Sequence, residues 1–170
     1  EQRGVQSGDL AVLKEVSNQM EHTVAILLAL ARAESLEKQP CDLKARIELM
    51  TLQCVQASGT EFELALDIAD SFTVTANPGL VDLLLTNLIN NAISHASNKQ
   101  LSISVRNGVL QFKNASEEQA LQNITSRGGK GQDSKGIGQG LYLVTRILES
   151  LEWDYQIQQH QQTFAIQISL

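Results

Sequence analysis

Glycine is concentrated in one part of this chain, where it could serve phosphate binding. Six of the eleven glycines lie within residues 128–140, directly before an apolar segment that begins at Leu141. Glycine lets backbone N–H groups approach a ligand closely, and a helix N-terminus carries partial positive charge. Gly136, Gly138 and Gly140 are therefore candidates for wrapping phosphates. By itself the pattern suits a mobile surface loop equally well, since it follows no predicted strand and lacks a P-loop ending.

A second group of polar residues lies upstream, in a segment with helical periodicity. Asn87, Asn91 and His95 are spaced four residues apart, so they form a stripe beside an apolar one. Amide oxygens on such a stripe can bind hydrated magnesium, which prefers oxygen ligands. The alternative is a helix whose asparagines merely face water. Asparagine is a mediocre helix former, however, so three of them within residues 87–91 favour a function. The apolar stripe comprises Leu80, Leu84, Leu88 and Ala92.

Together the two stretches resemble the nucleotide-binding domain of bacterial sensor histidine kinases. Asn87-Leu-Ile-Asn-Asn91-Ala is similar to the N box of that family. Residues 136–140 with Leu141 are similar to its second glycine box, in the same order and at the expected separation. Residues 15–34 resemble the second helix of the family's dimerisation and histidine-phosphotransfer hairpin. The resemblance therefore covers nearly the whole chain.

This resemblance implies a transferase that uses ATP and Mg²⁺. Asn91 would coordinate the magnesium that bridges the ATP phosphates, with Asn87 assisting beside it. Residues 115–135 would form a lid over the nucleotide, and the glycines of residues 136–140 would wrap its phosphates. His95 and Leu141 complete the expected nucleotide-binding set. Three cations lie in or beside the lid: Arg127, Lys130 and Lys135. They either neutralise γ-phosphate charge or are ordinary solvated side chains.

Several positions depart from the family pattern. Its first glycine box has Asp-x-Gly after a strand, the Asp binding the adenine amino group, whereas this chain has Asn114-Ala115-Ser116. An asparagine carbonyl still accepts that hydrogen bond, but without charge assistance. Asn114→Asp is therefore expected to tighten ADP binding. Asn90 stands where many members carry an acidic base, and Ser94 where many carry a phosphate-binding cation. We expect ATP binding to be retained better than fast catalysis.

The phosphoacceptor histidine is not evident in this chain. His22 is the only histidine of the leading segment, but Glu21-His22-Thr23 does not reproduce the family motif and lies off the packed stripe. His160 falls in a predicted hairpin turn and is interpreted as a surface residue. We expect the acceptor on a helix before residue 1, so that this chain does not label itself.

The composition is that of a globular protein and argues against broad binding to nucleic acid. Hydrophobic residues make up 42% and charged residues 19% of the 170 residues, and the net charge is −6. No basic stripe offsets that charge, and no apolar run approaches the length that spans a bilayer. No signal peptide is evident in the sequence. Cys41 and Cys54 have neither metal-ligand nor redox-motif spacing, which favours reduced thiols in the cytosol.

The elements that must position these residues fall into two parts. Residues 9–37 are predicted to form one helix with a heptad seam that needs a partner helix. Gln39-Pro40 ends it and marks the domain boundary. The resemblance implies a partial dimerisation hairpin over residues 1–38 and an ATP-binding catalytic domain over 39–170. The seam consists of Leu13, Val16, Met20, Thr23, Leu27 and Leu30.

The second part is predicted to be an α+β sandwich with helices on one face of a mixed sheet. The resemblance implies that this is a Bergerat-type fold. Asp42 caps a predicted helix to residue 57, and a turn at residues 77–79 begins the asparagine helix. Asn107-Gly108 is a hairpin turn, and residues 115–135 form a loop. Helix is also expected at 138–150, and strands at 61–66, 72–75, 101–105, 109–113, 153–158 and 163–169.

Three functions remain open at this stage. The first is the catalytic domain of a two-component histidine kinase, with a homodimeric, membrane-anchored parent, a cytoplasmic location and a response regulator as partner. The second is a degenerate module that binds nucleotide weakly, which the asparagine at position 114 favours. The third is another Bergerat-fold ATPase of the gyrase, mismatch-repair or chaperone kind, which the leading heptad helix disfavours.

Overall fold

The computed structural model describes residues 37–69, 71–116, 124–126, 139–160 and 162–170. It also describes the helical, exposed Ser17, Met20, Val24, Leu28 and Ala31. Outside these residues lie His22, Arg127, Lys130, Lys135, Gly136 and Gly138. The elements are β1 (Gln39–Asp42), α2 (Leu43–Ser58), β2 (Glu63–Asp67), β3 (Thr73–Ala76), α3 (Pro78–His95), β4 (Gln100–Arg106), β5 (Val109–Ala115), β6 (Ile124–Ser126), α4 (Gln139–Leu151), β7 (Asp154–His160) and β8 (Thr163–Ser169).

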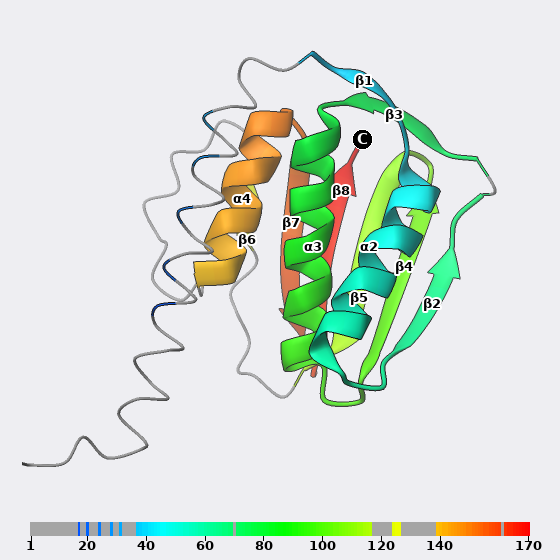
Figure 1. The fold of residues 1–170 in the computed structure, drawn as a ribbon, viewed down its shortest axis with the longest axis vertical. Coiled ribbons are helices and arrows are strands. Elements are labelled where there is room, and N and C mark those ends of the chain that lie inside the picture. Colours follow the sequence, from blue (N-terminus) through cyan, green and yellow to red (C-terminus); the bar gives the residue numbers. More distant parts are fainter. Residues whose placement is uncertain are drawn as a thin grey trace, which may run out of the picture.

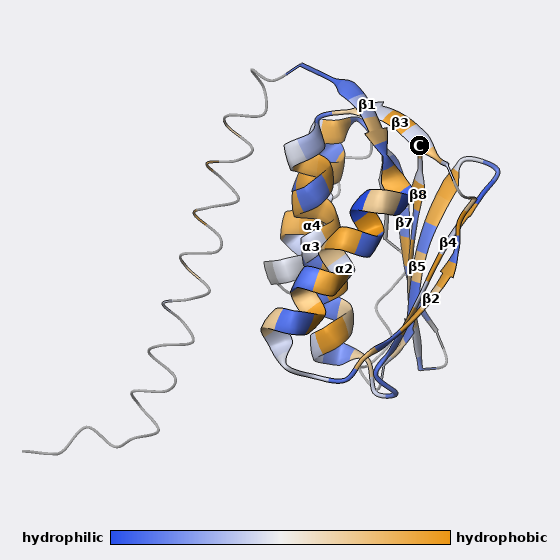
Figure 2. Ribbon diagram, turned by 45° about the vertical axis from the view of Figure 1, so that its right-hand side comes forward, coloured by the Kyte–Doolittle hydropathy of each residue, from blue (hydrophilic) through white to orange (hydrophobic). Residues whose placement is uncertain are grey.

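The described strands form two sheets. The larger has six strands in the order β2-β4-β5-β8-β7-β6, with β2 and β4 parallel and the other neighbours antiparallel. The smaller is the antiparallel pair of β1 and β3. Helices α2, α3 and α4 all cover one face of the large sheet (Figures 1 and 2). The predicted α+β architecture, with helices on one face of a mixed sheet, is confirmed.

The hydrophobic core lies between the helix layer and the sheet. Alternate residues of the strands are buried, among them Ile103 in β4, Phe112 in β5 and Ile166 in β8. The opposite face of the sheet carries mostly polar side chains, so each strand buries one face only. The apolar stripe predicted for α3 is buried throughout, as expected for a helix that packs on a sheet.

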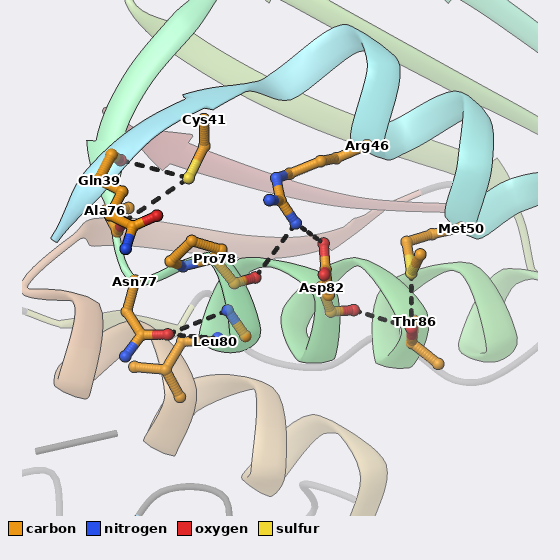
Figure 3. Close-up of polar contacts among 11 residues, drawn as sticks. Gln39, Cys41, Arg46, Met50, Ala76, Asn77, Pro78, Leu80, Asp82 and Thr86 are labelled. Carbon is orange, nitrogen blue, oxygen red and sulfur yellow. Dashed lines mark hydrogen bonds and ion pairs between the residues drawn. The ribbon is translucent and has the colours of Figure 1, made fainter. Parts of the chain in front are cut away.

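Local signals set the start of α3 and its attachment to α2 (Figure 3). Asn77 Oδ1 accepts hydrogen bonds from Gly79 N at 3.0 Å and Leu80 N at 3.2 Å, which makes it the N-cap. Arg46 of α2 pairs with Asp82 of α3 and also donates to the carbonyl of Pro78. This half-buried ion pair fixes α3, the helix that carries the asparagines, against α2.

The structure differs from the sequence-based expectations at three places. Residues 39–42 form β1, which pairs with β3; the sequence indicated only a boundary there. Within the expected loop over residues 115–135, Ala115 completes β5 and residues 124–126 form β6. His160 ends strand β7 opposite Thr163 rather than lying in the turn. In each case pairing with a distant strand extends the regular structure, which local composition does not reveal.

Candidate nucleotide-binding site

Asn91 and Gly140 meet where α3 and α4 cross. Gly140 is the second residue of α4, and a Cβ atom built on it would lie 2.8 Å from Asn91 Oδ1. Such a distance is too short for a real contact, so a glycine is required for the two helices to approach this closely unless the amide moves. The structure thus brings the N-box-like and second-glycine-box-like stretches together, although they are far apart in the sequence.

The Asn91 amide is available for a ligand. This side chain is half-buried, and within the described part of the chain it makes no hydrogen bond. A partly desolvated amide without a protein partner is costly unless water or a ligand satisfies it. Its oxygen lies beside the first turn of α4, where backbone N–H groups have no intrahelical acceptors. An amide oxygen and N–H donors that have no intrahelical acceptors suit a cation bridged to phosphate.

Asn87 is itself buried, whereas the sequence predicted that it lies with Asn91 and His95 on a polar stripe beside the buried one. Its side chain is only 5% exposed, and Nδ2 donates to the carbonyl of Leu83 at 2.8 Å. The helix is rotated so that Asn87 faces inward while Asn91, one turn later, lies half-buried at the α4 junction. His95 is exposed at the last residue of α3, and Leu141 is buried in the core. Leu141 therefore anchors the start of α4.

Asn114 lies on the same helix-facing side of the sheet, next to the end of β5. It is 8% exposed, and its Nδ2 donates to the carbonyl of Ala115 at 3.0 Å. No described residue donates a hydrogen bond to Oδ1. The hydrogen bond to Ala115 therefore determines which half of the amide is left to bind a ligand. That half is an acceptor.

Two further buried polar residues accompany Asn114, and the sequence-based reasoning missed one of them. Ser116 is 3% exposed and Gln159 6%, and Gln159 Nε2 donates to Ser116 Oγ at 3.4 Å. Gln159 lies on β7, on the same face as the buried Tyr155 and Ile157. The alternation of Tyr155 and Ile157, extended by one step, would have placed Gln159 on the inner face. The sequence-based prediction missed this because it assigned residues 159–162 to a turn.

The donor chemistry constrains how a metal could be held. Across the described ranges, no group of three or more His, Cys, Asp or Glu side chains could hold an ion. A metal at Asn91 would thus take its remaining ligands from phosphate oxygens and water. Magnesium is commonly bound in this way, because it dehydrates reluctantly and keeps several waters. The residues present fit a magnesium–nucleotide complex better than a dedicated metal cage.

Comparisons with known proteins find similar sequences and similar structures. No family model matches the chain. It is 32% identical over 111 residues to the sensor histidine protein kinase HK06 of Streptococcus pneumoniae, in strains D39 and R6. That alignment covers 61% of this chain and 25% of the relative, so the chain spans about a quarter of the curated proteins it matches.

Solved structures share the fold. The histidine kinase AdeS of Acinetobacter baumannii has a TM-score of 0.65 at 23% identity, covering 97% of this chain and 86% of its own. The cytoplasmic segment of histidine kinase QseC has a TM-score of 0.61 at 15% identity, covering 99% and 96%. The catalytic domain of histidine kinase ThkA has a TM-score of 0.56 at 11% identity, covering 78% and 95%.

The fold is that of the catalytic domains of histidine kinases of known structure. More particularly, the chain resembles the C-terminal part of a bacterial sensor histidine kinase, and the sequence and structural matches both support this resemblance. In the described residues, no helix is both long and apolar enough to cross a bilayer.

Proposed function

We propose that this chain is the ATP-binding catalytic portion of a two-component sensor histidine kinase, transferring the ATP γ-phosphate to a histidine on a helix outside the chain. The observation that carries the proposal is the contact between Asn91 and Gly140. The end of α3 and the start of α4, which carry these residues, lie toward the same end of the helix–sheet interface as the end of β5, which carries Asn114 (Figure 1). The proposed phosphate, metal and base contacts are therefore grouped at one end of the helix–sheet interface.

Each of these residues has a distinct role at that end. The Asn91 oxygen would be the protein ligand of Mg²⁺, and the first turn of α4 would donate backbone N–H groups to phosphate oxygens. Bound magnesium–ATP supplies the reactive phosphoryl group. Phosphoryl transfer depends mainly on positioning and charge stabilisation, so these groups would hold the triphosphate rather than react with it. Arg127, Lys130 and Lys135 remain proposed cations for the γ-phosphate.

Asn114 would recognise the base. Its Oδ1 is an acceptor, and the exocyclic amino group of adenine is a donor, whereas guanine presents a carbonyl at that edge. The hydrogen bond from Nδ2 to Ala115 holds the amide in the orientation that suits adenine. The site is therefore proposed to prefer ATP and ADP over guanine nucleotides.

The parent protein is proposed to be a homodimer that joins through the long helix and passes phosphate to a response regulator. Residues 1–38 would belong to the dimerisation hairpin and 39–170 to the catalytic domain. In support, the isolated ThkA catalytic domain covers 78% of this chain, about the share that residues 39–170 make up. We also propose membrane anchoring of the parent and a cytoplasmic position for this portion, by analogy with the cytoplasmic segment of QseC.

A second candidate function is a degenerate module that binds nucleotide weakly and signals through dimer contacts. Asn114 and Ser116 favour it, since an uncharged acceptor and a buried, hydrogen-bonded serine replace the expected aspartate and glycine. Autophosphorylation of the full-length parent would exclude this alternative.

Calorimetric titration with ADP, with and without Mg²⁺, tests the proposed site. Asn91→Ala should lose the part of the affinity that depends on magnesium. Thr86→Ala is the matched control, because Thr86 is also half-buried on α3 but faces Met50 of α2. Equal magnesium-dependent affinities for the wild type and Asn91→Ala would exclude Asn91 as the metal ligand.

A further inference from the structure

Asn114, Ser116 and Gln159 form a polar cluster on an otherwise apolar surface. The side of the sheet that faces the helices is lined elsewhere by large hydrophobic residues, such as Ile103, Phe112 and Ile157. Polar groups are buried among such residues at a cost in free energy unless they are hydrogen-bonded. The three polar residues lie together at one end of the sheet, where the proposed base contact also lies. This placement suggests that Ser116 and Gln159 serve the same purpose as Asn114.

The peptide group between Ala115 and Ser116 is held at both of its polar atoms. The carbonyl of Ala115 accepts from Ser97 N at 3.1 Å and from Asn114 Nδ2 at 3.0 Å. The amide N of Ser116 donates to the carbonyl of Gln162 at 2.9 Å. The last bond extends the β5–β8 ladder by one residue beyond the pair of Ala115 and Thr163. The orientation of this peptide decides where the Asn114 amide can donate.

Gln159 reaches the side chain of Ser116 from two strands away. Its strand, β7, is separated from β5 by β8, a distance of about 10 Å at the usual spacing. Gln159 pairs with Phe164 of β8, which in turn pairs with Asn114 of β5. Only a long, unbranched polar side chain crosses that gap to donate to Ser116 Oγ. The contact therefore ties the β7–β8 hairpin to the end of β5.

An asparagine that reads a base needs such a restraint. Unlike a carboxylate, an amide has an acceptor on one side and a donor on the other, so a half-turn would present Nδ2 instead of Oδ1. With Nδ2 outward, the same residue would favour a base with a carbonyl at that edge. The hydrogen bond to Ala115 prevents this half-turn only while the peptide after Ala115 keeps its orientation.

We propose that Gln159 is a positioning residue for nucleobase selection: through Ser116 it holds the peptide that keeps Asn114 oriented as an acceptor for adenine. The inference rests on the proposed function, since it concerns the base contact of the same nucleotide site. Gln159 does not need to touch the nucleotide. Its effect is transmitted by two hydrogen bonds and one peptide group.

The test compares ADP with inosine diphosphate (IDP), whose base carries a carbonyl where adenine has the amino group. Gln159→Met keeps the length of the side chain but removes the donor. We expect it to weaken ADP binding about fivefold, the worth of one hydrogen bond, without weakening IDP binding. Ser116→Ala should have the same effect, and the double variant should add nothing further. Gln158→Met is the control, because Gln158 is exposed on the opposite face.

The possible outcomes separate the inference from the proposed function. Equal losses for ADP and IDP would show a structural role only and would overturn the inference, and melting temperatures of all variants identify such a general loss. A wild-type chain that binds ADP no better than IDP would overturn both the inference and the Asn114 contact, but not the phosphate site at Asn91. A wild-type chain that binds neither would overturn the proposed function itself.

Discussion

Gly140 leaves just enough room for the Asn91 amide, since a single added Cβ atom would lie 2.8 Å from Asn91 Oδ1. The two residues come from helices that are adjacent in space but separated in sequence by β4, β5 and β6. The close approach makes the position of the amide oxygen depend on the absence of a side chain on α4. The proposed metal contact of Asn91 and the packing of α3 against α4 are therefore coupled at this one contact.

Gly140→Ala should weaken magnesium–ADP binding while leaving the fold intact. The new methyl group displaces the end of the Asn91 side chain, which costs about 1 kcal/mol of binding, or roughly fivefold in affinity. Alanine is favoured over glycine within a helix by up to about 1 kcal/mol, so thermal stability should not fall. Calorimetry and a melting curve measure the two effects separately. If Gly140→Ala lowered the affinity of the Asn91→Ala variant as well, the glycine would act independently of Asn91.

Asn114→Asp is expected to weaken ADP binding, which is the opposite of what the sequence alone predicts. A carboxylate would be the stronger acceptor for the adenine amino group, a gain of about 1 kcal/mol. It would also place its second oxygen against the carbonyl of Ala115, where Nδ2 now donates. Losing that bond and creating an oxygen–oxygen contact costs about 1–3 kcal/mol, which outweighs the gain. Titration with ADP and GDP checks this, and tighter ADP binding would show that Ala115 imposes no such restraint.

The chain alone should not label itself with phosphate. Its proposed nucleotide site is present, but His22 does not match the acceptor motif of the family, and the proposed acceptor helix lies elsewhere. After incubation with magnesium and radiolabelled ATP, the protein should remain unlabelled at times when a full-length parent would be phosphorylated. Acid-labile phosphate on His22 would contradict this prediction and identify His22 as the acceptor.

Arg46→Met should destabilise the catalytic domain by about 1–2 kcal/mol, because it leaves Asp82 without its half-buried partner. The matched control is Arg106→Met, which removes a much more exposed pair with Asp67 and should destabilise the protein less. Asp82 raises the pKa of Arg46. The contribution of the arginine charge is thus complete at neutral pH and is lost only as pH rises through that elevated pKa. Equal losses for both variants in denaturant unfolding would argue against a role for burial.

The elements that follow from local sequence could be predicted closely. Asp42 caps its helix as expected, because an N-cap needs only one side chain and the next backbone amides. The turn predicted at residues 77–79 begins α3, with Asn77 as its N-cap. Asn107 and Gly108 both adopt positive φ at the predicted hairpin turn. The periodicity of Leu80, Leu84, Leu88 and Ala92 was sufficient to predict the buried face of α3.

The candidate site could be predicted only as a set of residues, and its geometry came from tertiary packing. Whether Asn91 reaches Gly140 depends on the crossing angle between α3 and α4, which cannot be predicted from the sequences of the two helices. The inward turn of Asn87 and the orientation of the Asn114 amide follow from hydrogen bonds to particular backbone carbonyls. The contact between Gln159 and Ser116 spans a third strand. Periodicity and caps act within a few residues, so sequence determined the elements, whereas contacts between distant elements decided which polar atoms face the proposed nucleotide.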